Sequence, residues 1–335
     1  MSQSHSFGVN SLTIDLGAEA DLIAERLRRY LAATKRKGAV VALSGGIDSS
    51  VTAALCVRAL GSKRVFGLHM PERASSPETI ALSTAISDAF GFDSAVEQIS
   101  PVLEAVGCYR RYDEAVQQVV PEYGPGWKSK IVLPSVTDSD ALRIYSVVVE
   151  DPEGDQSRHR MTTDAYLGVL AATNFKQRVR KMMEYHYADR LNYVTTGTPN
   201  RLEYDQGFFV KLGDGAADVK PIAHLYKSQV YAMAEYLGVP EAIRNRPSTT
   251  DTYSLAQSQE EFYFSLPYER MDLCLYGKNN GVPIEDVAKA TELTAEQVER
   301  VNRDIDQKRK TTSYLHLQPE LATDIPEIAH ILPCD

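Results

Sequence analysis

Residues 44–50 combine two glycines, an acid and three hydroxyls, in the order Ser-Gly-Gly-Ile-Asp-Ser-Ser. This run follows the apolar residues 39–43 directly and precedes an apolar stretch with helical spacing. A helix that begins after a strand directs its free amides and the positive end of its dipole at an anion. Gly45 and Gly46 let the backbone approach that anion, and the serine hydroxyls can donate hydrogen bonds to it. The residue types and their spacing therefore predict a phosphate-binding turn.

Asp48 lies inside this turn, where a carboxylate alone would repel a phosphate. A divalent cation removes the conflict, because hard cations bind carboxylate and phosphate oxygens together. We therefore expect a pyrophosphate-binding turn that carries its own metal ligand. The alternative is an ordinary glycine turn with Asp or Ser as a helix cap. Two other phosphate motifs are excluded: GxxxxGK[ST] is absent, and GDGAAD at 213–218 ends in Asp218 where GxGxxG has glycine.

Strands and helices alternate around this turn, as is typical of a parallel sheet. Residues 39–43 have the continuous apolar character of a strand that is buried on both faces. The apolar residues of 18–34 fall on one helical face, so a helix precedes that strand. The pattern continues with helix 49–60, strand 64–70, helix 77–90, helix 164–190, strand 192–198 and helix 225–237. This order predicts an α/β fold, a doubly wound parallel sheet with flanking helices.

Two segments depart from the alternation. Residues 121–160 are rich in proline and hold two strand-like runs, SKIVLPS and LRIYSVVVE, which we interpret as an inserted hairpin or flap. Residues 245–335 begin with a polar loop at 245–258 and continue with two helices within 284–309, which mimic a helix-turn-helix only superficially because the second helix carries four acids. We predict a single domain over 1–335, with the flap inserted in it and a loop and C-terminal helices on the substrate side.

The composition excludes several classes of protein. The net charge of −9 and the two short basic runs, at 35–37 and 307–310, argue against a nucleic-acid partner. The four cysteines are scattered, so neither a disulfide framework nor a zinc site is expected. The sequence shows neither a secretion signal nor an apolar run of membrane-spanning length. These observations predict a cytoplasmic protein with no membrane association.

The SGGxDS string resembles the signature of the PP-loop ATP pyrophosphatases, and two downstream segments resemble the ammonia-dependent NAD synthetase family in particular. NFKQRVRKMMEYHYA at 174–188 is similar to its N-x-K-x-R-x-R segment. TTGTPNRLEYDQGFFVKLGDGAADVKPIAHLYKSQVYAMAEYLGVP at 195–240 is similar to its GT-x-N-x-x-E…GFFTKYGDGxAD…P…L-K run. The resemblance covers roughly 20–95 and 170–310, and it implies the adenine nucleotide alpha hydrolase-like form of the α/β fold.

The resemblance also implies roles for residues at matching positions. Asp48 and Lys227 would be catalytic, and Asp48 with Glu203 would hold Mg²⁺. The residues implied for ATP binding are Ala42, Leu43, Ser44, Gly45, Gly46, Ile47, Asp48, Ser49, Thr198, Lys227 and Ser248, the last standing where the family usually has Thr. The residues implied for substrate binding are Asn174, Arg178, Lys211, Asp218, Gln307 and Lys308. Each of these has an ordinary structural alternative as a cap, a loop acid or a surface cation.

The implied reaction is the amidation of deamido-NAD to NAD. The substrate carboxylate would attack the α-phosphorus of ATP to give an acyl-adenylate and pyrophosphate, and ammonia would then displace AMP. This chemistry needs positioning and charge neutralisation more than a covalent nucleophile. The cofactors implied are ATP as co-substrate and Mg²⁺, and the protein would be a homodimer. Only about forty residues precede the turn, so ammonia would come free or from a separate glutaminase subunit.

Two departures from the family pattern leave alternatives open. The 121–160 segment is outside that pattern, and residues 246–272 read RPSTTDTYSLAQSQEEFYFSLPYERMD where the family tends to read P-T-A-D-L followed by D-E-x-x-L-G-x-x-Y. Both changes fall on the expected substrate side. A paralogous PP-loop amide ligase that amidates another carboxylate is therefore the alternative. A non-catalytic ATP-binding regulator is a third, and the two acids Asp48 and Glu203 argue against it.

Overall fold

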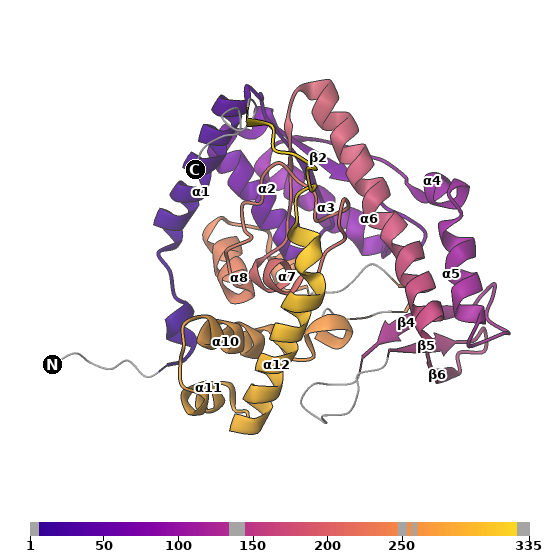
Figure 1. Cartoon of the computed structure of the whole chain (residues 1–335). Helices are drawn as coiled ribbons and strands as arrows, with labels where there is room; N and C mark the ends of the chain where they lie inside the picture. Colours follow the sequence, from indigo (N-terminus) through magenta and orange to yellow (C-terminus); the bar gives the residue numbers. More distant parts are fainter. Residues whose placement is uncertain (1–6, 134–144, 247–252, 256, 258–259, 327–335) are drawn as a thin grey trace.

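Four parallel strands form the central sheet of the computed structural model, in the order β3-β2-β1-β7 (Figure 1). The structure describes residues 7–133, 145–246, 253–255, 257 and 260–326. The strands are β1 (Ala39–Ala42), β2 (Val65–His69), β3 (Asp93–Val96) and β7 (Val194–Thr196). In the central strand β1, Val40 pairs with Phe66 of β2 and Ala39 pairs with Val194 of β7. Because all four strands are parallel, their carboxyl ends meet at one edge of the sheet.

Helices cover both faces of this sheet, which confirms the predicted doubly wound α/β fold. One face packs against α1 (Leu16–Thr34), α2 (Ile47–Leu60) and α8 (Lys227–Tyr236), whose apolar residues share one core with β1. The other face packs against α4 (Ser100–Ala105), α5 (Cys108–Gln117) and the long helix α6 (Thr163–Leu191). Burial on both faces explains why the residues of β1 form an unbroken apolar run.

Local signals explain where the long helices begin. The carboxylate of Asp15 accepts a hydrogen bond from the Ala18 amide at the start of α1. The hydroxyl of Thr162 accepts one from the Ala165 amide at the start of α6. The remaining helices are α3 (Pro77–Phe90), α7 (Arg201–Gln206), α9 (Glu241–Arg244), α10 (Tyr268–Asn279), α11 (Ile284–Thr291), α12 (Ala295–Thr312), the short 3₁₀ turns at 9–12, 62–64 and 313–316, and a π turn at 260–264.

The segment predicted as a hairpin or flap forms a separate antiparallel sheet in the order β4-β5-β6. Its strands are β4 (Lys128–Val132), β5 (Ser146–Glu150) and β6 (Gln156–Arg160). The prediction of two strands is corrected to three, because the third reads Gln-Ser-Arg-His-Arg and lacks the apolar residues by which a strand is recognised. The sheet packs on α5 and the first turns of α6 (Figure 1).

The C-terminal helices form a second core beside the main sheet. α10, α11 and α12 pack together around Met271, Leu275 and Val301, and α7 joins them through Leu202. The two helices expected within 284–309 are present as α11 and α12, and Figure 1 shows α12 running past α7. None of the helices in the described residues combines the length and the apolar character that a membrane span requires.

Candidate active site

The predicted phosphate-binding turn lies at the carboxyl end of β1 and leads into α2. The Ser44 amide donates to the Ser49 hydroxyl at 3.3 Å, the Gly46 amide donates to the Ser44 hydroxyl at 3.3 Å, and the Ser50 hydroxyl donates to the Gly46 carbonyl at 2.9 Å. Gly45 has a φ of 71°, and a Cβ there would lie 2.9 Å from the Thr79 carbonyl oxygen. Gly46 is the N-cap residue of α2 and has no side chain to cap it, so the first-turn amides remain for a ligand.

Asp48 projects from the first turn of α2 and is held by two partners. The side-chain amide of Asn200 donates to Asp48 Oδ1 at 3.0 Å, and Lys227 Nζ forms an ion pair with Asp48 Oδ2. Lys227 is buried at the start of α8. Burial disfavours its charge, but the carboxylates of Asp48 and Glu203 outweigh that effect and raise the pKa of Lys227. The pairing with these acids therefore favours the charged form of Lys227.

Glu203 lies near Asp48, on the first turn of α7. Its Oε2 accepts a hydrogen bond from the Asn200 amide at 3.0 Å, while Asn200 Oδ1 accepts from the amides of Leu202 and Glu203 in a capping box. Burial, and then the charge of Asp48, raise the pKa of Glu203 to about 8, against an ordinary value of 4.5. Two acids that are far apart in the sequence are thus brought together beside the phosphate turn.

Asn200 is the residue that links these two acids. Its Oδ1 is occupied by two backbone amides, so its Nδ2 is the end of the side chain that reaches Asp48. One buried side chain thereby caps α7, orients Glu203 and holds Asp48. Sequence reasoning did not name Asn200, although its position in Asn-x-x-Glu is the signal of a capping box.

Asp272 of α10 positions Lys227 by binding the backbone at the start of α8. Its two carboxylate oxygens accept hydrogen bonds from the Lys227 amide at 3.2 Å and the Ser228 amide at 2.7 Å, so it caps α8 from α10. Burial raises the pKa of Asp272 to about 6, although the Ser228 hydrogen bonds oppose this. This cap comes from outside the local sequence of α8, so no pattern around Lys227 could have indicated it.

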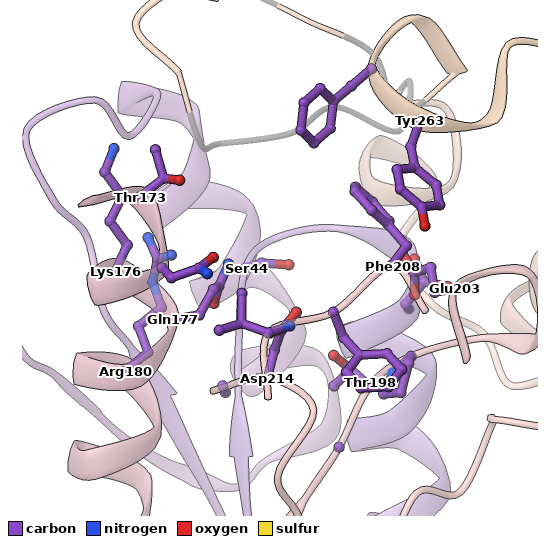
Figure 2. Close-up of a pocket in the computed structure, with 18 of the residues that line it drawn as sticks. Ser44, Thr173, Lys176, Gln177, Arg180, Thr198, Glu203, Phe208, Asp214 and Tyr263 are labelled. Atoms are coloured by element: carbon purple, nitrogen blue, oxygen red, sulfur yellow. The ribbon is translucent and has the colours of Figure 1, made fainter. Parts of the chain in front are cut away.

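A cavity of about 940 Å³ opens in front of the phosphate turn. Figure 2 shows its two walls, with Thr173, Lys176 and Arg180 of α6 on one side and Phe208 and Tyr263 on the other. The predicted site residues that line it are Ala42, Leu43, Ser44, Ile47, Asp48, Ser49, Gly46, Asn174, Arg178, Thr198, Glu203, Lys211, Gln307 and Lys308. Residues from five stretches of the chain therefore meet at this edge of the sheet.

The predicted substrate-binding residues have partners of their own. The Arg178 guanidinium donates to the Lys211 carbonyl at 3.4 Å, and Lys211 Nζ donates to the Tyr314 carbonyl at 2.7 Å. Lys308 is buried, and its Nζ donates to the Tyr263 carbonyl at 2.7 Å. The last turns of α12 are thus tied to the wall that carries Phe208 and Tyr263.

Of the predicted site residues that the structure describes, three do not line the cavity. Gly45 packs against α3, Lys227 lies behind Asp48, and the carboxylate of Asp218 accepts a hydrogen bond from the Thr195 amide at 2.7 Å. Ser248 lies outside the described residues. A direct substrate contact by Asp218 stays a prediction, since its carboxylate serves the end of β7 in this structure.

Charged residues of α6 that sequence reasoning did not name also line the cavity. Lys176 Nζ bonds the buried carboxylate of Glu72 at 2.8 Å, and Lys181 Nζ bonds Glu184 at 2.6 Å. Burial raises the pKa of Glu184, and its pairing with Lys181 opposes that shift. Such pairs need good geometry to offset the cost of desolvating two charges. The available signal for Lys176 was its place as the lysine of the N-x-K-x-R-x-R segment.

Comparison with known proteins identifies this arrangement. The family model described as NAD synthase matches residues 20–122 and 147–313. An NH(3)-dependent NAD(+) synthetase of Rhizobium meliloti (strain 1021) is 58% identical over 322 residues, which is 96% of this chain and 96% of that protein. The chain belongs to the NAD synthase family. As an NAD synthase it is a ligase that forms a carbon–nitrogen bond. Residues 123–146 fall between the two stretches that the family model matches.

Solved structures agree with this fold. The NMN synthetase from Francisella tularensis superposes with a TM-score of 0.62 at 22% identity, over 92% of this chain and all of that one. The NH3-dependent NAD synthetase from Campylobacter jejuni superposes with a TM-score of 0.59 at 20% identity, over the same shares. At these identities the likeness shows the NAD synthase fold and not the substrate.

Proposed function

We propose that this chain converts deamido-NAD, ATP and ammonia into NAD, AMP and pyrophosphate, with the phosphate turn as the catalytic centre. The main support for this proposal is that Asp48, Glu203 and Lys227 lie together at the turn that begins α2. The alternative, a ligase for a different carboxylate, is not favoured, because a relative at 58% identity over nearly the whole chain is an NH(3)-dependent NAD(+) synthetase.

The two acids fit a magnesium ion. They offer hard oxygen donors, and their mutual repulsion is the kind of charge conflict that a divalent cation relieves. Two carboxylates leave most of the six coordination positions of Mg²⁺ open, so phosphate oxygens and water would complete the coordination. Asp48 and Glu203 would hold the ion, which when bound neutralises charge on the triphosphate.

The chain's own residues supply the remaining effects. The amides at the start of α2 and the hydroxyls of Ser44 and Ser49 bind phosphate oxygens, and Lys227 adds a fixed positive charge. The substrate carboxylate attacks the α-phosphorus, the bond to the bridging oxygen breaks, and pyrophosphate leaves. Ammonia then attacks the acyl carbon, the acyl–oxygen bond breaks, AMP leaves, and the surplus proton passes to solvent. The site acts by positioning and by charge neutralisation.

We also infer several features that accompany this activity. The chain would form one domain over 1–335 with an insertion at 121–160, and would act as a homodimer in the cytoplasm. Ammonia would arrive free or from a separate glutaminase subunit. Light scattering of the purified protein, alone and with its substrates, measures the oligomeric state, and a monomer at assay concentrations would contradict the dimer.

A coupled assay tests the reaction itself. Purified protein with ATP, Mg²⁺, ammonium and deamido-NAD should release pyrophosphate and form NAD in equal amounts. Omitting any of the four components should stop both products. Pyrophosphate release that depends on some other carboxylic acid, with none for deamido-NAD, would contradict the proposal.

Asn200→Ser separates the two tasks of Asn200. Serine can still cap α7, but it is too short to replace the amide that donates to Asp48. We expect the free energy of unfolding to stay within about 1 kcal/mol of the wild type, while the rate of pyrophosphate release falls about tenfold or more. Urea denaturation and the coupled assay measure the two effects. An unchanged rate would mean that Asp48 does not need this donor.

A further inference from the structure

The loop from β2 to α3 forms the wall of the cavity beside the phosphate turn. Met70 and Ser75 of this loop line the cavity, and Gly45 of the turn packs against the first turn of α3. A separate wall is formed by α6, which carries Asn174 and Arg178. Under the proposed function, ATP bound at the turn lies against the loop, whereas deamido-NAD contacts α6. The two substrates that must react are therefore bound by two different walls.

The side chain of Glu72 joins these two walls. It leaves the loop two residues after Met70, and it is fully buried. Its Oε1 accepts a hydrogen bond from Lys176 Nζ of α6 at 2.8 Å, and its Oε2 accepts one from the Tyr109 hydroxyl of α5 at 2.9 Å. The Glu72 amide also donates to the Ser75 hydroxyl at 3.0 Å, so backbone and carboxylate hold the loop together.

Electrostatics strengthen this link. Burial alone would raise the pKa of Glu72, but the charge of Lys176 and the hydrogen bonds to the carboxylate outweigh burial and lower that pKa. Burial raises the pKa of Tyr109 to about 12, so its hydroxyl stays protonated and remains a donor. The Arg73 guanidinium lies over the Tyr109 ring, 3.7 Å from its centroid, which adds a second contact between the loop and α5.

The helices that hold Glu72 are also joined to each other. The buried Cys108 thiol of α5 donates to the Ala172 carbonyl of α6 at 3.3 Å. The Arg180 guanidinium of α6 donates to the Met70 carbonyl at 3.4 Å, at the start of the loop. The loop is therefore fixed against a frame of two helices, and Glu72 is the buried centre of that attachment.

We propose that Glu72 is a positioning residue that sets the placement of the two substrates relative to each other. This rests on the proposed function, in which the substrate carboxylate attacks the α-phosphorus of ATP. Glu72 does not line the cavity, so it acts through the loop and α6 and not by contact with a substrate. Attack depends steeply on the placement of the reacting atoms. A loosened link therefore lowers the rate of attack while each substrate alone still binds.

Glu72→Asp tests the link, because it keeps the charge but is one methylene too short to reach Lys176 and Tyr109 together. We expect the first-turnover rate of pyrophosphate release to fall about tenfold or more. The dissociation constants of ATP and of deamido-NAD, each measured alone by calorimetry, should stay within about twofold of wild type. Glu72→Gln keeps the length and an oxygen acceptor, so it should retain more of the rate. Glu104→Gln, at an exposed acid of α4, is the matched control.

Tyr109→Phe loosens the link without touching either buried charge. It keeps the ring under Arg73 and removes only the hydroxyl, so we expect a smaller fall in the first-turnover rate, of about threefold. The melting temperature of each variant shows how much of the protein is folded in the assay.

Three outcomes would overturn the positioning role. One is an unchanged first-turnover rate in Glu72→Asp, which would leave the proposed function standing because the wild type would still form NAD. Another is a rate that falls only in proportion to the fraction of unfolded protein, since this would show a structural role alone. The third is weaker binding of ATP or of deamido-NAD alone, which would mean that Glu72 shapes the site of a single substrate.

Discussion

Asp48→Asn is expected to abolish pyrophosphate release while the chain remains folded. The change keeps the size of the side chain and one of its oxygens but removes the charge that pairs with Lys227 and that would hold the cation. We expect the rate to fall by about 100-fold or more, the scale of losing one preorganised electrostatic group. The coupled assay measures this loss, and circular dichroism with a melting curve checks the fold.

The structure also explains why this variant should tolerate the loss of the ion pair. A buried lysine without its partner is costly, but Glu203 lies close enough to take over. The charge of Asp48 is one of the causes that raise the pKa of Glu203, so removing it lowers that pKa and lets Glu203 ionise beside Lys227. Asp21→Asn, at an exposed surface acid, is the matched control. Wild-type turnover in Asp48→Asn would contradict the metal role of Asp48.

The sequence allowed the sheet and its catalytic turn to be predicted because their signals are local. An unbroken apolar run, two glycines and an acid at a helix start are enough to identify β1 and the turn into α2. The long helix α1 was predictable for the same reason, since it combines the capping residue Asp15 with a sustained period of apolar residues, and Thr162 marks the start of α6 in the same way. Where the chemistry depends on a short contiguous motif, as at residues 44–50, the structure has the strand, turn and helix that the motif predicts.

The features that could not be predicted depend on contacts between distant segments. The short helix α7 is set by the Asn200 capping box and by its burial under α12, and strand β3 has no buried residue to mark it. Asp272 is an acid of α10 whose function as the cap of α8 exists only in three dimensions. The cavity wall likewise brings together Tyr145 with Tyr166 of α6, and Tyr253 with Phe262, which no spacing rule connects.

Glu203→Gln is expected to remove activity and, at the same time, to change how stability depends on pH. The amide cannot bind a cation as a carboxylate does, so we expect the rate to fall by about 100-fold or more. In the wild type, burial and then Asp48 raise the pKa of Glu203 from 4.5 to about 8. Its contribution to the free energy of unfolding is therefore complete below about pH 4.5 and declines as the pH rises through about 8.

Glutamine does not titrate, so Glu203→Gln should lack this decline. The free energy of unfolding of the variant, relative to the wild type, should therefore rise steadily between about pH 5 and pH 8.5. Adding magnesium and pyrophosphate together should raise the melting temperature of the wild type more than that of the variant, because only the wild type keeps both acids. Glu235→Gln, an exposed acid of α8, provides the control. A constant difference in stability across this pH range would show that Glu203 is not held as a buried acid beside Asp48.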